Sequence, residues 1–130
     1  MRWRLLEYVD GDQRVLSDWS LQSVQRARLD QRLDMVRSVG LSLPPNLVAG
    51  PGIDGERHIY KFKVKGNVQL RPLLCRGPQD GRTELTFLAR AIERDDILEP
   101  AGVAAVAERR RIEVSLDSRK RVALYDDEDD

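Results

Sequence analysis

Cations recur in residues 58–76, HIYKFKVKGNVQLRPLLCR, at a spacing that suits an anionic ligand. Alternate side chains of an extended chain point to opposite faces, so Lys61, Lys63 and Lys65 would share one face and apolar side chains the other. Arg71 follows, and no acidic residue interrupts the stretch. Such a surface could bind an anion, or it could be only the solvated face of a sheet.

The same stretch predicts two neighbouring strands joined by a tight reversal at residues 65–67. A hairpin of this kind could bring Lys61, Lys63 and Arg71 together over one phosphate. If Arg71 faced away from the two lysines, this site would not exist.

Charge is segregated along the chain, although its 22 basic and 22 acidic residues balance. The last five residues are all acidic, and without them 17 acidic residues stand against 22 basic ones, an excess of five positive charges. Between Arg57 and Arg76 the chain holds six basic residues and no acidic one. This segregation favours an anionic partner for the central region. The acidic tail would either be a solubilising end or fold back on the basic face.

Composition excludes several classes of protein. Cys75 is the only cysteine, so an internal disulfide is impossible and a cysteine-based metal site is not expected. The sequence has no apolar run of about 18 residues that could span a membrane. Its N-terminus, MRWRLLEYVDGD, lacks the apolar stretch of a secretory signal. We expect a cytoplasmic protein that uses neither a metal nor another cofactor.

The first forty residues predict a strand followed by helix. Residues 2–8 form the strand, which a turn signal at Asp10-Gly11-Asp12 ends. Residues 17–40 predict a helical hairpin or one bent helix, with a broad apolar stripe and Gly40 as its stop.

A loop and three strands follow in the middle of the chain. Residues 41–55 are rich in proline and glycine and predict the loop. We expect a bulge or irregular pairing at Pro72, because proline removes a hydrogen-bond donor from the ladder. The three strands are expected at residues 59–65, 68–75 and 83–92.

Pro100 suits the first turn of a final helix. The element order β-α-α-β-β-β-α then indicates an α+β domain with an antiparallel meander. We expect this domain to span residues 1–114, and residues 115–130 to be an extension whose acidic tail is disordered.

The segments IYKFKVKG, LRPLLCRGP, ELTFLARAIERDD and EPAGVAAVAERRR occur in this order, and together they resemble the phage-derived toxins of the RelE/HigB superfamily, components of toxin–antitoxin modules. The resemblance covers roughly residues 2–112, and LRPLLCRGP with the apolar strand after it is its most specific part. It implies a small antiparallel sheet packed on an N-terminal helical pair. It also implies a ribosome-dependent endoribonuclease, an mRNA interferase, that a small helix-turn-helix antitoxin neutralises.

Cleavage of RNA by its own 2′-hydroxyl needs a base, an acid and positive charge around the phosphate. By the resemblance, Lys61 and Lys63 match paired strand lysines, one of which would be the base, and Arg71 would clamp the phosphate. Some members of the family have a Tyr or His shortly after the last strand, where this chain has neither, and His58 could replace that acid. The other residues expected to contact RNA or phosphate are Arg57, Lys65, Arg76, Arg90 and Arg94.

Two alternatives to the nuclease stay open. The first is a protein of the same fold that binds RNA or protein as a phage or prophage regulator and cleaves nothing. The second is a ParE-like protein that poisons gyrase, since the gyrase-directed branch generally lacks the full set of catalytic cations. For His58 a structural role is also an alternative to the catalytic one, because it is a lone histidine in a loop flanked by glycine and proline.

Overall fold

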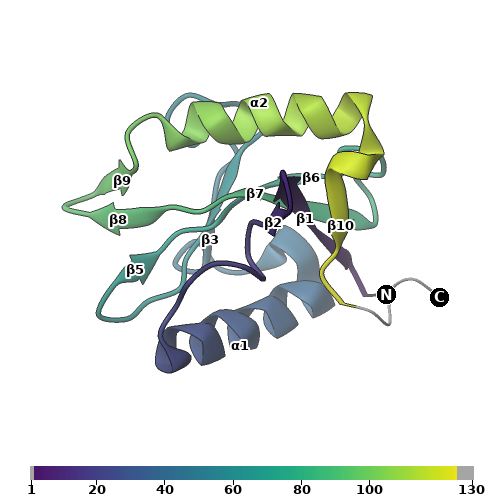
Figure 1. The fold of residues 1–130 in the computed structure, drawn as a ribbon. Helices are drawn as coiled ribbons and strands as arrows, with labels where there is room; N and C mark the ends of the chain where they lie inside the picture. Colours follow the sequence, from purple (N-terminus) through teal and green to yellow (C-terminus); the bar gives the residue numbers. More distant parts are fainter. Residues whose placement is uncertain (1, 126–130) are drawn as a thin grey trace.

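The computed structural model describes residues 2–125, which form a mixed sheet with one long helix on each side (Figure 1). Helix α1 spans Ser23–Val39, and helix α2 spans Val103–Leu116. No helix in this part of the chain is long and apolar enough to cross a membrane. The acidic residues 126–130, for which disorder was predicted, lie outside the described residues.

The large sheet has the strand order β10-β1-β7-β6-β4-β3, and β2 pairs with β1 alone. Strands β1 and β7 run parallel, so the prediction of a purely antiparallel sheet is wrong. A helix and several strands separate them in sequence, and this long connection lets β7 enter beside β1 in the same direction. The strands are β1 (Arg4–Asp10), β2 (Gln13–Arg14), β3 (Val48–Ala49), β4 (Tyr60–Phe62), β6 (Leu73–Arg76), β7 (Glu84–Ala89) and β10 (Arg121–Ala123).

A second sheet of three short strands extends from the large one, in the order β5-β8-β9. Strand β5 (Gln69–Leu70) ends just before Arg71 and Pro72, and the chain then joins the large sheet as β6. The predicted strand at residues 83–92 is likewise divided, because β7 ends at Ala89 and β8 (Ile92–Arg94) pairs with β5. Strand β9 (Ile97–Glu99) completes the small sheet.

The predicted N-terminal helical pair is absent from the described residues, which hold one long helix in that region. Residues 15–18 form turns, and α1 begins only at Ser23, after a capping box between Gln22 and Gln25. The buried carboxylate of Glu7 accepts hydrogen bonds from the backbone N–H groups of Leu16 and Ser17. These bonds tie the segment to β1 and satisfy the two backbone donors.

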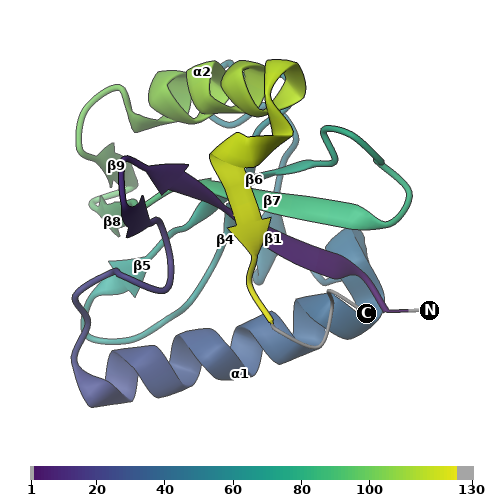
Figure 2. The same ribbon diagram turned by 45° about the vertical axis from the view of Figure 1, so that its right-hand side comes forward.

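The two helices lie on opposite sides of the sheet in both views (Figures 1 and 2). Leu29, Leu33 and Val36 of α1 belong to a buried cluster with Phe62 and Phe87, whose rings meet edge to face at 5.8 Å. On the other side, residues of α2 and of the sheet form a second buried cluster. Its members include Leu73, Cys75, Leu88, Val103, Ala104 and Ala107. The sheet is thus the middle layer of three, and both of its faces are largely covered.

Two short 3-10 helices, η1 (Gly40–Ser42) and η2 (Ser118–Lys120), follow the two long helices. After η2 the chain returns to the sheet as β10, which pairs antiparallel with β1. The described residues beyond 114 therefore contribute an edge strand.

Candidate functional site

The strand lysine Lys61 and Arg71 meet on one carboxylate, that of Glu93. The Nζ atom of Lys61 lies 2.9 Å from Oε2 of Glu93, and Nε of Arg71 lies 2.8 Å from Oε1. The side chains of Lys61, Arg71 and Glu93 are 16%, 8% and 15% exposed, respectively. Since both cations reach one carboxylate, they lie on the same side of the hairpin, and a carboxylate occupies the place expected for a phosphate.

Glu93 comes from β8, a strand that is distant in sequence from the hairpin and adjacent to it in space. Partial burial raises the pKa of its carboxyl, but the hydrogen bonds and charges of Lys61 and Arg71 outweigh this and hold the pKa below the usual value. The Glu93 carboxyl therefore stays ionised, and Lys61, Arg71 and Glu93 together carry a net positive charge of about one. The hairpin sequence alone carried no sign of this acid.

The remaining hairpin lysines are less engaged. Lys63 lies between Phe62, which pairs with Val48, and Val64, which pairs with Leu70. It is half-buried, and among the described residues its side chain has no ion pair or hydrogen bond. Lys65 is exposed, and its carbonyl accepts a hydrogen bond from Arg28. The structure thus brings Lys61 and Arg71 together on Glu93, and among the described residues neither Lys63 nor Lys65 has an acidic partner.

A pocket of about 180 Å³ lies where the chain enters β4, and it gathers His58, predicted to be catalytic, with Arg57 and Arg76, predicted to bind RNA. Arg57 and His58 come from the loop before β4, and Arg76 ends β6. Sequence reasoning missed Tyr60, the first residue of β4, and Arg111, which comes from α2. The lining residues, here called the His58 pocket, are Pro51, Arg57, His58, Tyr60, Arg76, Pro78 and Arg111.

The His58 pocket has an excess of positive charge. Arg111 is paired with Glu108, and its Nη2 lies 2.9 Å from Oε2 of the carboxylate. The hydrogen bond from Arg111 is the main reason that the pKa of the Glu108 carboxyl is lowered, and the charge of His58 lowers that pKa further. The guanidinium of Arg76 lies 5.6 Å from the centre of the Trp3 ring, and Arg76 is exposed. Arg57 is exposed and has no acidic partner among the described residues.

Arg90 and Arg94 do not belong to this pocket or to the Glu93 group. Arg90 donates to the carbonyls of Val15 and Arg14 at 2.7 and 3.1 Å, which ties β7 to the turns before α1. Arg94 lies 3.4 Å from Glu99 in an exposed ion pair. Both cations therefore have structural partners, and neither faces the residues predicted to be catalytic.

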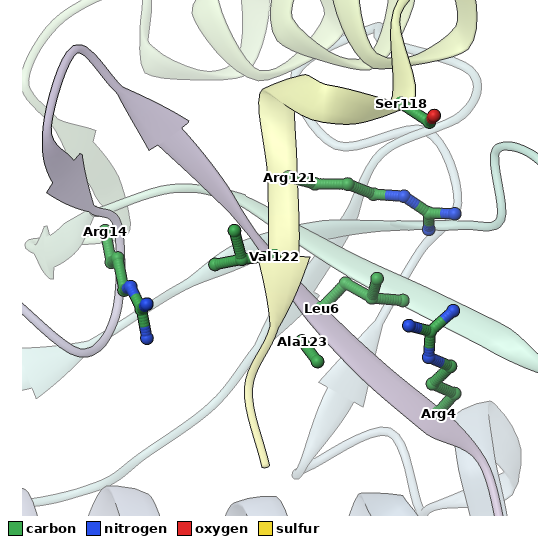
Figure 3. Close-up of a pocket in the computed structure, with 7 residues that line it drawn as sticks. All are labelled: Arg4, Leu6, Arg14, Ser118, Arg121, Val122 and Ala123. Atoms are coloured by element: carbon green, nitrogen blue, oxygen red, sulfur yellow. The ribbon is translucent and has the colours of Figure 1, made fainter. Parts of the chain in front are cut away.

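A further arginine cluster, which the sequence did not reveal, lies beside β10 (Figure 3). Arg4, Arg14, Ser118 and Arg121 line a cleft of about 460 Å³ there. The guanidinium of Arg121 is buried and already bonded, to Glu84 at 3.0 Å and to the Thr86 hydroxyl at 3.1 Å. Figure 3 shows Arg14 on the opposite side of β10 from Arg4 and Arg121. Within this cluster Arg121 has a structural role, because its bonds join β10 to β7.

The residues offer little for a metal. Within residues 2–125 no three His, Cys, Asp or Glu side chains stand close enough to hold an ion. Burial raises the pKa of the Cys75 thiol to about 12, which keeps it protonated.

Comparison of the chain with protein-family models, curated proteins and solved structures finds no match. The resemblance to RelE/HigB toxins therefore stays a prediction that depends on the residues of this chain.

Proposed function

We propose that the protein binds RNA at the His58 pocket and cleaves messenger RNA there as a RelE/HigB-like toxin. The observation that supports this is the composition of one pocket: an imidazole, a phenol and three guanidinium groups around about 180 Å³. Guanidinium groups recognise phosphate through paired hydrogen bonds, and an imidazole can carry a proton at neutral pH. The pocket therefore offers an acid and positive charge for cleavage of RNA, and solvent would act as the base.

In the proposed reaction the 2′-oxygen of a ribose attacks the adjacent phosphorus, and the bond from phosphorus to the 5′-oxygen breaks. The proton of the 2′-hydroxyl passes to solvent, and protonated His58 gives a proton to the leaving 5′-oxygen. The products are a 2′,3′-cyclic phosphate and a 5′-hydroxyl end. Arg57 and Arg76 stabilise the charge that develops on the phosphate oxygens.

The resemblance supports two further parts of the proposal. The target would be message on the ribosome, which would place the protein in the cytoplasm. Its partner would be a small helix-turn-helix antitoxin. A neighbouring reading frame for such a protein would support this, and co-expression should then restore growth.

Induced expression in a bacterium, followed by mapping of mRNA 5′ ends, tests the proposal. We expect growth arrest and new ends within translated messages. His58→Ala should abolish these ends, and Arg57→Ala with Arg76→Ala should reduce them strongly. Arg109→Ala is the matched control, because Arg109 is exposed on α2 outside the pocket. Unchanged cleavage by His58→Ala would refute His58 as the acid.

A second candidate is a protein that binds RNA without cleaving it. Glu93 favours this alternative, because it occupies Lys61 and Arg71, two of the cations predicted to act on the phosphate. RNA retained in a filter-binding assay, with no new 5′ ends in cells, would support it. Growth arrest with DNA damage and intact mRNA would instead support the gyrase alternative.

A further inference from the structure

A groove of about 570 Å³ runs between the start of α1 and the hairpin loop. It shares no lining residue with the His58 pocket. Its walls come from the segment that enters α1 and from the loop that joins the two hairpin strands. The lining residues, here called the α1 groove, are Ser20, Leu21, Gln22, Val24, Gln25, Arg28, Val64, Lys65, Gly66, Asn67, Val68 and Leu70.

The α1 groove has a cationic rim. Arg28 and Lys65 both line it, and Nη1 of Arg28 donates to the carbonyl of Lys65 at 3.3 Å, which holds the guanidinium against the hairpin loop. Gly66 makes this approach possible, because a Cβ at that position would lie 2.8 Å from Nη1 of Arg28. No acidic residue lines the groove. The rim therefore presents two positive charges without a carboxylate among its lining residues.

The rest of the groove is apolar or carries neutral amides. Val64 and Leu70 are buried below it, and Leu21 and Val68 are half-buried. Val24 lies on the side of α1 that borders the groove and is 60% exposed. Exposed apolar surface with a charged rim is typical of a protein interaction site.

We propose that the α1 groove binds an acidic amphipathic segment of a partner protein. Apolar side chains of that segment would cover Val24 and Val68, and its carboxylates would pair with Arg28 and Lys65. Single-stranded RNA fits less well, since it is generally held by aromatic side chains that stack on its bases, and no aromatic residue lines this groove. The inference does not depend on the proposed nuclease activity.

The test uses synthetic peptides with the full-length protein labelled with ¹⁵N. The probe is a helical peptide of about 15 residues with leucine on one face and glutamate beside it. Two control peptides carry lysine in place of glutamate, or serine in place of leucine. We expect the glutamate–leucine peptide to shift the amide resonances of Val24, Arg28, Lys65 and Val68, and both controls to bind at least about tenfold more weakly.

Protein variants identify the groove as the binding site. Arg28→Glu with Lys65→Glu should weaken the peptide at least about tenfold and reverse the preference in favour of the lysine peptide. Arg109→Glu with Lys120→Glu makes the same charge change at exposed positions outside the groove, and it should leave binding unchanged. Val24→Ser should weaken binding without changing the charge preference.

Several results would overturn the proposal. These are shifts confined to other residues, equal binding of the lysine peptide, no binding at millimolar peptide, or shifts in the groove caused by an octauridine RNA and not by the peptide. The Arg28→Glu, Val24→Ser variant changes two lining residues of the groove and none of the residues predicted to contact RNA, so it should still produce new mRNA 5′ ends if the proposed nuclease is correct. Loss of peptide binding and loss of cleavage can therefore be told apart.

Discussion

The carboxylate of Glu93 holds Arg71 through an ion pair of 2.8 Å, and the arginine side chain is only 8% exposed. Lys61 shares the same carboxylate. Removal of one partner from a shielded pair is costly, because it leaves a desolvated charge without compensation. Here one glutamate compensates two cations that come from both strands of the hairpin, so its loss would affect the junction of the two sheets.

Glu93→Ala should therefore lower the free energy of unfolding by roughly 2 kcal/mol, between the values for exposed and for fully buried pairs. The matched control is Glu99→Ala, whose partner Arg94 is 67% exposed. That change should cost less than about 1 kcal/mol. Urea unfolding of both variants checks this, and equal losses would show that Glu93 is no more than a surface residue.

Acid should weaken the same contact. The pKa of the Glu93 carboxyl is lowered in the folded protein, since the bonds to Lys61 and Arg71 outweigh the opposing effect of burial. Its contribution to stability is thus fully present above the ordinary glutamate pKa and is lost as pH falls through the lower, folded-state value. Urea unfolding of the native protein and of Glu93→Gln between pH 7 and pH 3 should show a stability difference that shrinks only in the acidic range. A difference that stays constant would contradict this.

The sequence predicted the hairpin because its signals are local. Val64 pairs with Leu70 and Lys61 with Leu73, as expected for a reversal near residue 66. The α+β class also followed from the alternation of helical and strand patterns. The prediction of a helical pair was wrong, because residues 15–18 form turns that the buried carboxylate of Glu7 ties to β1. Periodicity within residues 17–40 could not show that contact.

The site was partly predictable for the same reason. Arg57, His58 and Arg76 lie close to the hairpin in sequence, and the structure places them in one pocket. Arg111 and Glu93 reach their places only through the packing of α2 and of the small sheet. Charge patterning within one segment cannot identify a residue that arrives from another element.

Cys75 should be unreactive in the folded protein. Burial, the largest effect, raises the pKa of its thiol to about 12, so very little thiolate is present at pH 8. Ellman's reagent should modify the native protein at least about a hundredfold more slowly than the protein in concentrated urea. Equal rates would mean that the β6 strand opens readily, since Cys75 is 1% exposed.

Arg121 should stabilise the edge strand β10. Its guanidinium bonds to Glu84, to Thr86 and, at 3.4 Å, to the carbonyl of Gly77. Arg121→Ala should lower the free energy of unfolding by about 3 kcal/mol, because Glu84 would remain buried with less compensation. Arg119→Ala is the matched control, since that side chain is 89% exposed, and it should change the free energy by less than about 1 kcal/mol. Hydrogen exchange of β10 amides should quicken only in the first variant.

The His58 pocket makes a prediction that is independent of cleavage. Each cation that contacts a phosphate of single-stranded RNA contributes about 0.7 to the slope of log K against log salt. Replacing both Arg57 and Arg76 with alanine should therefore reduce the slope by about 1.4, measured with an octauridine RNA by fluorescence anisotropy. Arg109→Ala should leave the slope unchanged, because Arg109 does not line the pocket. The contrary result is a full slope for the Arg57→Ala, Arg76→Ala variant and a reduced slope for a Lys63→Ala, Lys65→Ala variant. That result would mean that the phosphates bind along the hairpin and that the proposed position of the active site is wrong.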